Sequence, residues 1–309
     1  MATAISPHGI ESRTTLDADS QRALARWNRT RLQPGLPCGS HEVELAENHR
    51  MQQLEARFLA ELREEVRDEA AQAPTAPDDF VAWFERLRLT GPGQGDPLFP
   101  WLAERASREA LRWFFTQEAA GEAGFDDLLA LTQVKLPEPV KLELARNYWD
   151  EMGRGNAKGM HGRMLDALTE TLAVTPSIEN IAWESLALAN AMTGMATSRR
   201  YAWHSVGALG VIELTAPGRS AHVAHGLKRI GLSVRERHYF ELHAVLDVKH
   251  SADWNREALR PAVAEDPRRA AAIAEGALIR LRCGARCFRR YREHLWGVAQ
   301  AVPLPTLRQ

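Results

Sequence analysis

The chain has 309 residues, with 39 lysine and arginine residues against 40 aspartate and glutamate residues, and a net charge of −1. This balance gives no indication of a nucleic-acid partner or of an acidic membrane surface. No apolar run reaches the length of a membrane span and the N-terminus has no apolar signal-peptide core, so we expect a soluble, cytoplasmic protein that binds neither nucleic acid nor membrane.

Helical periodicity recurs from end to end and alternating runs of β-branched residues are missing, which predicts an all-α protein. We expect a polar, mobile segment over residues 1–40, a charged amphipathic helix over 44–66, a proline-rich break, a helix over 80–89 and a loop over 90–100. Further helices are predicted over 101–122, 125–133, 137–155, 161–174, 178–196, 199–216, 219–232, 238–250 and 266–296. Pro217 is expected to close the helix before it.

These elements predict a single domain over residues 41–300, built as a bundle of seven or more core helices. The core is expected at about 100–296, with N-terminal auxiliary helices up to about residue 98 packed outside it. Three cysteines, Cys38, Cys283 and Cys287, are too few for a disulfide framework in a chain of this size. We interpret them as reduced thiols, because no other cysteine or ligand-spaced histidine accompanies the pair in the last helix.

The segment HYFELHAVLDVKH, residues 238–250, places potential metal ligands on the apolar side of a helix. At about 100° per residue, His243, Asp247 and His250 project within a narrow arc of the face expected to point to the core. His238 and Glu241 point the opposite way. Burying a carboxylate between two imidazoles costs several kcal/mol unless something compensates, and a divalent metal does so. The alternative is a metal-free network in which Asp247 accepts hydrogen bonds from both histidines.

Three other places offer acidic or imidazole side chains in unusual surroundings. Glu118 follows a run of aromatic residues, although exposed glutamates at helix ends are common. Glu213 is the only acid in an apolar stretch and needs a metal, an arginine or a buried donor as partner. Glu151 and His161 flank three glycines, each of which weakens a helix by about 1 kcal/mol, so this segment is either an ordinary turn or one that becomes ordered with a ligand.

Together these pieces form a combined motif. It comprises a glutamate, a DE-x-G-x-G segment with a histidine ten residues after its glutamate, a glutamate thirty residues before the next histidine, and H-x-x-x-D-x-x-H followed by a tryptophan. The motif, with GLKRIGL and YFELH, resembles the haem-oxygenase-like diiron oxidases and oxygenases, also called the iron-containing redox enzyme family. The resemblance covers roughly residues 100–296. It implies an all-α, haem-oxygenase-like seven-helix bundle with extra N-terminal helices.

The resemblance also implies two Fe(II) ions per chain, often reversibly bound, that activate O2 as co-substrate. Carried over residue by residue, the metal ligands are Glu118, His161, Glu213, His243, Asp247 and His250, with Glu151 as an extra ligand when the site is fully loaded. Glu122, one turn after Glu118, is a competitor for that position. Three carboxylates with three imidazoles suit iron or manganese better than a structural zinc site.

Competing classes lack their own signatures in this chain. Neither E-x-x-H, used by ferritin-like bundles, nor HExxH, used by zinc proteases, occurs. A haem oxygenase needs one axial histidine and leaves the other inward-facing ligands unexplained. Metal-free relatives of the same fold do not need H-x-x-x-D-x-x-H. A non-enzymatic helical interaction protein with a buried polar network is the remaining alternative.

The family resemblance implies oxidation of an amino acid or an amino-acid-derived amine, with N-oxygenation favoured, in natural-product biosynthesis. The alternative reaction is oxidative C–C cleavage or decarboxylation of an amino or fatty acid at the same site. We expect a small-molecule amine or acid as substrate, an external electron donor and a homodimer. Arg280, Arg282 and Arg286 of the last helix are candidates for binding a substrate carboxylate, because guanidinium groups bind carboxylates in a bidentate manner.

Overall fold

The computed structural model describes residues 14–36, 39–121 and 124–301, and these ranges contain helices and no strand. The helices are α1 (Ala18–Leu32), α2 (His41–Ala70), α3 (Pro77–Thr90), α4 (Leu98–Glu104), α5 (Arg108–Glu118), α6 (Phe125–Thr132), α7 (Glu138–Glu151), α8 (His161–Thr171), α9 (Trp183–Thr197), α10 (Ala202–Arg229), α11 (His238–Asp253), α12 (Arg260–Glu265) and α13 (Arg269–Ala301). The all-α prediction is confirmed. Within the described ranges, no helix is both long and apolar enough to cross a membrane.

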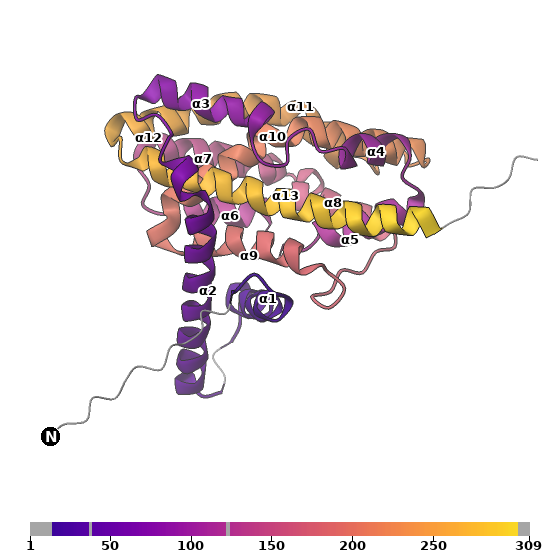
Figure 1. The fold of residues 1–309 in the computed structure, drawn as a ribbon, viewed down its shortest axis with the longest axis horizontal. Helices are drawn as coiled ribbons and strands as arrows, with labels where there is room; N and C mark the ends of the chain where they lie inside the picture. The colour runs from indigo at the N-terminus through magenta and orange to yellow at the C-terminus, as the bar shows by residue number, and fades with distance from the viewer. Residues whose placement is uncertain (1–13, 37–38, 122–123, 302–309) are drawn as a thin grey trace, which may run out of the picture.

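Helix α10 lies at the centre of the bundle and packs against α4, α9, α11 and α13 (Figure 1). Its crossing with α13 is close because a glycine lies on each side. A Cβ atom on Gly207 would lie 1.9 Å from the carbonyl oxygen of Ile273, and one on Gly276 would lie 1.9 Å from that of His204. The two backbones therefore touch where any side chain would separate them.

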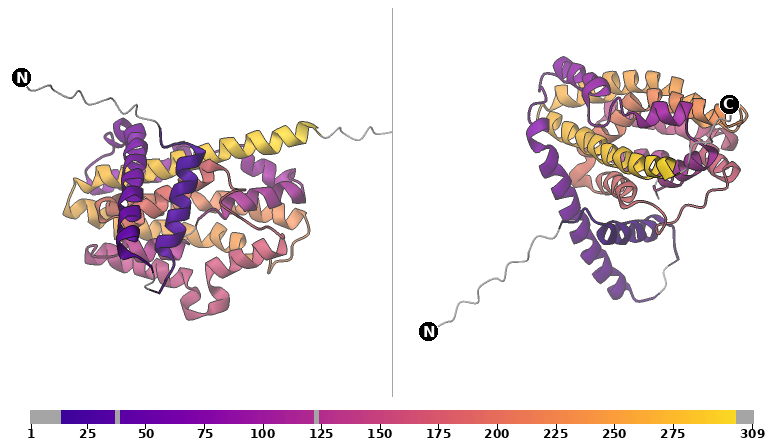
Figure 2. Two further views of the ribbon diagram at one scale, coloured as in Figure 1. Left: turned by 90° about the horizontal axis from the view of Figure 1, so that it is seen from below. Right: turned by 45° about the vertical axis from the view of Figure 1, so that its right-hand side comes forward.

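Helices α1 and α2 lie outside this bundle, as Figure 2 shows from two sides. Helix α2 contacts α13, and α1 lies against α9. The expectation of a mobile segment up to about residue 40 is wrong for residues 18–32, which form α1. Leu24 and Trp27 are buried, and the buried Asn28 donates a hydrogen bond to Asn190 of α9 at 2.9 Å. Asp17 caps the start of the helix. Residues 1–13 and Cys38 lie outside the described part.

Pro217 does not end a helix, which corrects a second expectation. Helix α10 continues through it to Arg229. A proline in a helix lacks the N–H that would bond the carbonyl of Glu213 and costs about 3 kcal/mol. Burial of Leu214 before it and of Val223 and Leu227 after it favours the continuous helix.

Two further boundaries differ from the predicted ranges. The helix expected over 101–122 is broken between α4 and α5, where the Ser107 hydroxyl accepts a hydrogen bond from the Ala110 N–H at 3.1 Å and starts a new helix. After α11 the chain passes through a π-helical turn, Trp254–Leu259, into α12. π-Helical turns are rare and concentrate near functional sites.

Candidate metal centre

Helix α11 buries its polar side chains. The buried residues of this helix are His243, Asp247 and His250, whereas Val245 and Val248 are 74% and 57% exposed. The predicted burial of the trio is therefore confirmed. Such an inversion of the usual helix pattern is costly unless the buried groups have partners.

The trio is shared between two groups of potential ligands. Glu151, His161 and His243 form the first triplet, and Glu213, Asp247 and His250 form the second. Within each triplet the three ligand atoms lie within 4.8 Å of one another. Six of the seven residues named by the resemblance are thus brought together from α7, α8, α10 and α11. In the i, i+4, i+7 pattern on α11, His243 belongs to the first triplet, and Asp247 and His250 belong to the second.

The first triplet depends on a tight turn between α7 and α8. Gly153, Arg154 and Gly155 all have positive φ angles, of 59°, 53° and 83°. A Cβ atom on Gly153 would lie 2.3 Å from the carbonyl carbon of Gly159, so the backbone at these two glycines is in contact. The close approach sets His161, the first residue of α8, beside Glu151, the last residue of α7.

Both imidazoles of the first triplet bring a ring nitrogen close to the Glu151 carboxylate. The Nδ1 of His243 donates to the carbonyl oxygen of Tyr239 at 2.7 Å, which leaves Nε2 unprotonated and 3.9 Å from Glu151 Oε1. His161 Nδ1 lies 2.9 Å from the same oxygen but forms no hydrogen bond. Burial lowers the pKa of His243 to about 4, so its ring is neutral at pH 7.

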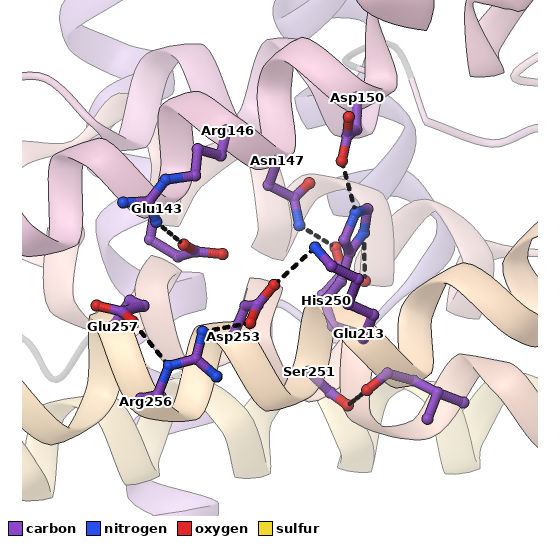
Figure 3. A network of polar contacts seen from close by, with 12 residues as sticks. Glu143, Arg146, Asn147, Asp150, Glu213, His250, Ser251, Asp253, Arg256 and Glu257 are labelled. Atoms are coloured by element: carbon purple, nitrogen blue, oxygen red, sulfur yellow. Dashed lines mark hydrogen bonds and ion pairs between the residues drawn. The ribbon is translucent and has the colours of Figure 1, made fainter.

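The second triplet is held by residues of α7 (Figure 3). Asn147 donates to Glu213 Oε1 at 2.6 Å, and His250 Nε2 donates to Asp150 Oδ2 at 3.1 Å. Arg154 in turn contacts Asp150 at 2.6 Å. The Nδ1 of His250 therefore faces the triplet, 3.5 Å from Glu213 Oε2, and is buried without a hydrogen bond. A carboxylate behind an imidazole fixes the ring and its tautomer, as is typical of metal-binding histidines.

Asp247 has no hydrogen-bond partner in the described part of the chain, although it is only 3% exposed. The alternative network, in which Asp247 accepts from His243 and His250, is not what the structure contains, since both rings donate elsewhere. Burial and the nearby Glu213 raise the pKa of Asp247 to about 9. Burial would lower the pKa of His250, but Glu213, Asp150 and Asp247 together raise it to about 9.

These residues fit a divalent metal. Each triplet combines carboxylate oxygens with imidazole nitrogens, and each contains a buried Nδ1 atom that no protein group satisfies. Buried polar atoms are nearly always bonded, so two such atoms aimed at carboxylates indicate a missing positive partner. The described residues show no cysteine in either triplet, which disfavours a structural zinc site.

Glu118 lies apart from both triplets but faces the same cavity. This cavity, of about 200 Å³, is also lined by Glu151, Glu213, His243 and Asp247. Tyr291 donates a hydrogen bond to Glu118 Oε1 at 3.0 Å. Burial raises the pKa of Glu118, although its side chain keeps exposed surface. The competing Glu122 lies outside the described residues.

The three arginines proposed for substrate binding separate into two kinds. Arg280 lines the cavity. Arg282 instead contacts Glu69 at 2.7 Å and Arg286 pairs with Glu65, both on α2. Cys283 and Cys287 are buried free thiols, and burial raises the pKa of Cys287 well above its ordinary value, as expected of unreactive cysteines.

Several residues of the site were missed by sequence reasoning. They are the supporting residues Asn147, Asp150, Tyr239 and Tyr291, and Arg219, which lines the cavity. A signal existed for Asn147, which lies one turn before Glu151 on the same face of α7. Arg219 also had a signal, because it is the only charged residue between Glu213 and His222 in an otherwise apolar helix.

Comparisons with known proteins identify the family and the fold of this chain. The model of a family described as iron-containing redox enzymes matches residues 112–285. Among solved structures, the chain is similar to a domain of unknown function with a haem-oxygenase-like fold from Shewanella denitrificans, with 14% sequence identity and a TM-score of 0.50, covering 75% of this chain and 97% of that chain. No curated protein matches. At this identity the structural similarity shows the fold alone, and it confirms the predicted haem-oxygenase-like bundle.

Proposed function

Because the chain belongs to the family of iron-containing redox enzymes, we propose that its two buried triplets bind two Fe(II) ions and that it uses O2 to oxidise a small molecule held in the adjoining cavity. The observation that carries this proposal is the pair of buried, unsatisfied Nδ1 atoms of His161 and His250, each beside a carboxylate. One positive ion in each triplet satisfies both the Nδ1 atom and the carboxylate beside it.

Each residue has a role in this proposal. Glu151, His161 and His243 hold one ion, and Glu213, Asp247 and His250 hold the other, with Glu118 as a further ligand from the cavity wall. Bound iron supplies the redox chemistry that no protein side chain provides, while the protein supplies binding, orientation and electrostatics. The carbonyl of Tyr239 holds the proton of His243 on its outer nitrogen, and Asp150 does the same for His250 once that ring has lost its second proton, which leaves the inner nitrogens available.

We propose an amino acid or an amino-acid-derived amine as substrate and N-oxygenation as the reaction, in natural-product biosynthesis in the cytoplasm. Inserting one oxygen atom of O2 into an N–H bond reduces the other atom to water, which requires two electrons and two protons from an external donor. Oxidative C–C cleavage or decarboxylation is the competing outcome, and it releases a one-carbon or shortened product.

The first test is an anaerobic Fe(II) titration followed by rapid mixing with O2. We expect two ions per chain, a higher melting temperature with Fe(II), and a transient visible absorption whose decay is faster with one of a set of amino acids and amines. Mass spectrometry then separates the reactions, because N-oxygenation adds oxygen without loss of carbon. Iron binding no greater than that of a metal-free control protein would return both triplets to a buried polar network.

A further inference from the structure

Two guanidinium groups face the cavity without a direct ion pair. Arg219 of α10 and Arg280 of α13 both line the cavity that adjoins the triplets. Within the described residues, neither forms a hydrogen bond or a salt bridge. Their neighbours on α13 differ, since Arg282 and Arg286 each have a glutamate partner on α2. An enclosed guanidinium without such a partner is unusual.

The two arginines also repel each other. The pKa of Arg219 is lowered to about 9, first by burial and then by the charge of Arg280, while Glu118 and Asp247 act in the opposite direction. An anion placed between the two guanidiniums removes this repulsion and satisfies their N–H groups. A carboxylate does this best among small organic groups, because its two oxygens match the planar fork of a guanidinium.

The local packing keeps both groups at the cavity. The guanidinium carbon of Arg219 lies 5.9 Å from the ring centre of Phe99 and 5.7 Å from that of Phe288. A Cβ atom on Gly284 would lie 2.9 Å from Arg280 Nη1, so the glycine leaves room for this guanidinium beside its own helix. Phe114, Leu188, Ile212, Val223 and Phe240 complete an apolar lining.

We propose that Arg219 and Arg280 together bind the carboxylate of the substrate, which is then a carboxylic acid or α-amino acid with an apolar chain. This inference rests on the proposed function in one respect, that the triplets oxidise what the cavity holds. A second, larger cavity of about 540 Å³ shares Phe99 and Arg219 with the inner one.

The competing role for these arginines is to balance the charges of Glu118 and Asp247. In that case neutralising an arginine changes iron binding and leaves carboxylate binding unaffected. The carboxylate proposal predicts the reverse. Because it assigns recognition to protein groups, binding is expected in the metal-free protein.

The test measures calorimetric binding of hexanoate, L-norleucine and hexylamine to metal-free protein, with Fe(II) stoichiometry measured separately. Wild type is compared with Arg219→Gln, Arg280→Gln and the control Arg282→Gln, which removes the same charge from the outer side of α13. We expect one or both acids to bind and hexylamine not to bind. Either cavity variant should weaken acid binding at least tenfold, which corresponds to about 1.4 kcal/mol, while the control and the iron stoichiometry stay unchanged.

Each result of the binding experiment supports or excludes the proposed carboxylate site. Binding of hexanoate identifies a simple acid as sufficient, and binding of norleucine alone identifies an amino acid. If neither acid binds wild type, if hexylamine binds equally well, or if both cavity variants keep wild-type affinity, the proposal is wrong. If a glutamine variant fails to fold, Arg219→Lys serves instead and should still weaken binding, because lysine lacks the fork. Acid binding without iron binding would refute the proposed function while leaving the carboxylate site intact.

Discussion

Burial of Asp247 costs folding free energy when no metal is bound. It is buried, has no hydrogen-bond partner in the described ranges, and lies with Glu213 in the same triplet. Two carboxylates in one buried site cannot both ionise cheaply, so the raised pKa of Asp247 follows. A divalent ion reverses this by favouring the ionised form. The residue therefore opposes stability when alone and supports it when metal is bound.

Replacement of ligands on α11 tests this assignment. We expect His243→Ala and Asp247→Ala each to lose about one iron ion per chain, and turnover with it, while remaining helical, because each removes a ligand from a different triplet. Asp247→Asn should remove the Fe(II)-induced rise in melting temperature without lowering that of the metal-free protein. Iron stoichiometry and thermal denaturation followed by circular dichroism are the measurements. His238→Ala on the exposed side of the same helix is the matched control.

A change at Glu151 should affect one of the two proposed ions more than the other. Glu151→Gln should reduce the iron content from two ions toward one, since the second triplet keeps all of its ligands. Equal loss of both ions would contradict its membership of a single triplet. Asn147→Ala tests the second triplet instead, because it removes the hydrogen-bond donor to Glu213.

Metal affinity should depend on pH through the second triplet. The pKa values of Asp247 and His250 are raised to about 9, so both groups are protonated below that pH in the metal-free protein. A metal ion binds only their deprotonated forms, and affinity therefore rises as the pH increases from 6 to 8. Each proton released contributes up to about tenfold per pH unit. Anaerobic titrations at several pH values measure this, and an affinity independent of pH would exclude proton release from these groups.

At the scale of elements, the turn between α7 and α8 decides whether the first triplet exists. Glu151 ends one helix and His161 begins the next, and the intervening backbone closes through positive φ angles at residues 153–155. Only a turn this tight brings the two side chains to 2.9 Å. The glycines that weaken helix formation in this segment are thus required by its geometry.

Gly153→Ala is expected to damage the first triplet. A Cβ atom there meets the backbone of Gly159 at 2.3 Å, and the φ of 59° is itself unfavourable for alanine by about 1–2 kcal/mol. We expect loss of about one iron ion per chain and a lower midpoint in urea denaturation. Gly162→Ala is the control, since nothing lies within 4 Å of its Cβ position. Full iron content in Gly153→Ala would mean that the turn adjusts without moving the ligands.

At the scale of the whole molecule, one ionic cluster ties the outer helix α2 to the core. Glu275 of α13 contacts Arg63 of α2 at 2.5 Å and His204 of α10 at 2.8 Å. Burial would raise the pKa of Glu275, but His204 and Arg63 lower it to about 2. Helix α2 lies outside the bundle (Figure 1), and this cluster joins it to two core helices that are far from it in the sequence.

Acid should weaken this link. The pKa of Glu275 is lower in the folded state than its ordinary value of 4.5, so the carboxylate stabilises the fold above pH 4.5 and loses this contribution as the pH falls toward 2. Glu275→Gln should lower the free energy of unfolding at pH 7 by about 1–2 kcal/mol after allowance for solvent screening. Denaturation at pH 7 and pH 3 should show a smaller difference at the lower pH. Glu265→Gln, in an exposed pair with Arg269, is the control.

Periodicity alone was enough to predict the all-α class and most helices, because each long helix carries its own apolar face. The predictions from periodicity that were wrong failed for the same reason. Pro217 lies inside α10 and residues 18–32 form α1 because burial against distant segments offsets local preference. A single sequence contains no record of those distant contacts.

The sequence by itself determined that His243, Asp247 and His250 share one face of α11, since 4 and 3 spacing on one helix is a local property. Only the tertiary structure decided how six ligands divide into two triplets, that Asp247 lacks a partner, and that Glu118 lies apart from both. The same holds for Arg219 and Arg280, which are 61 positions apart in the sequence and meet at one cavity. The physical reason is that ion pairing and burial depend on distances between elements, which follow from packing and not from spacing along the chain.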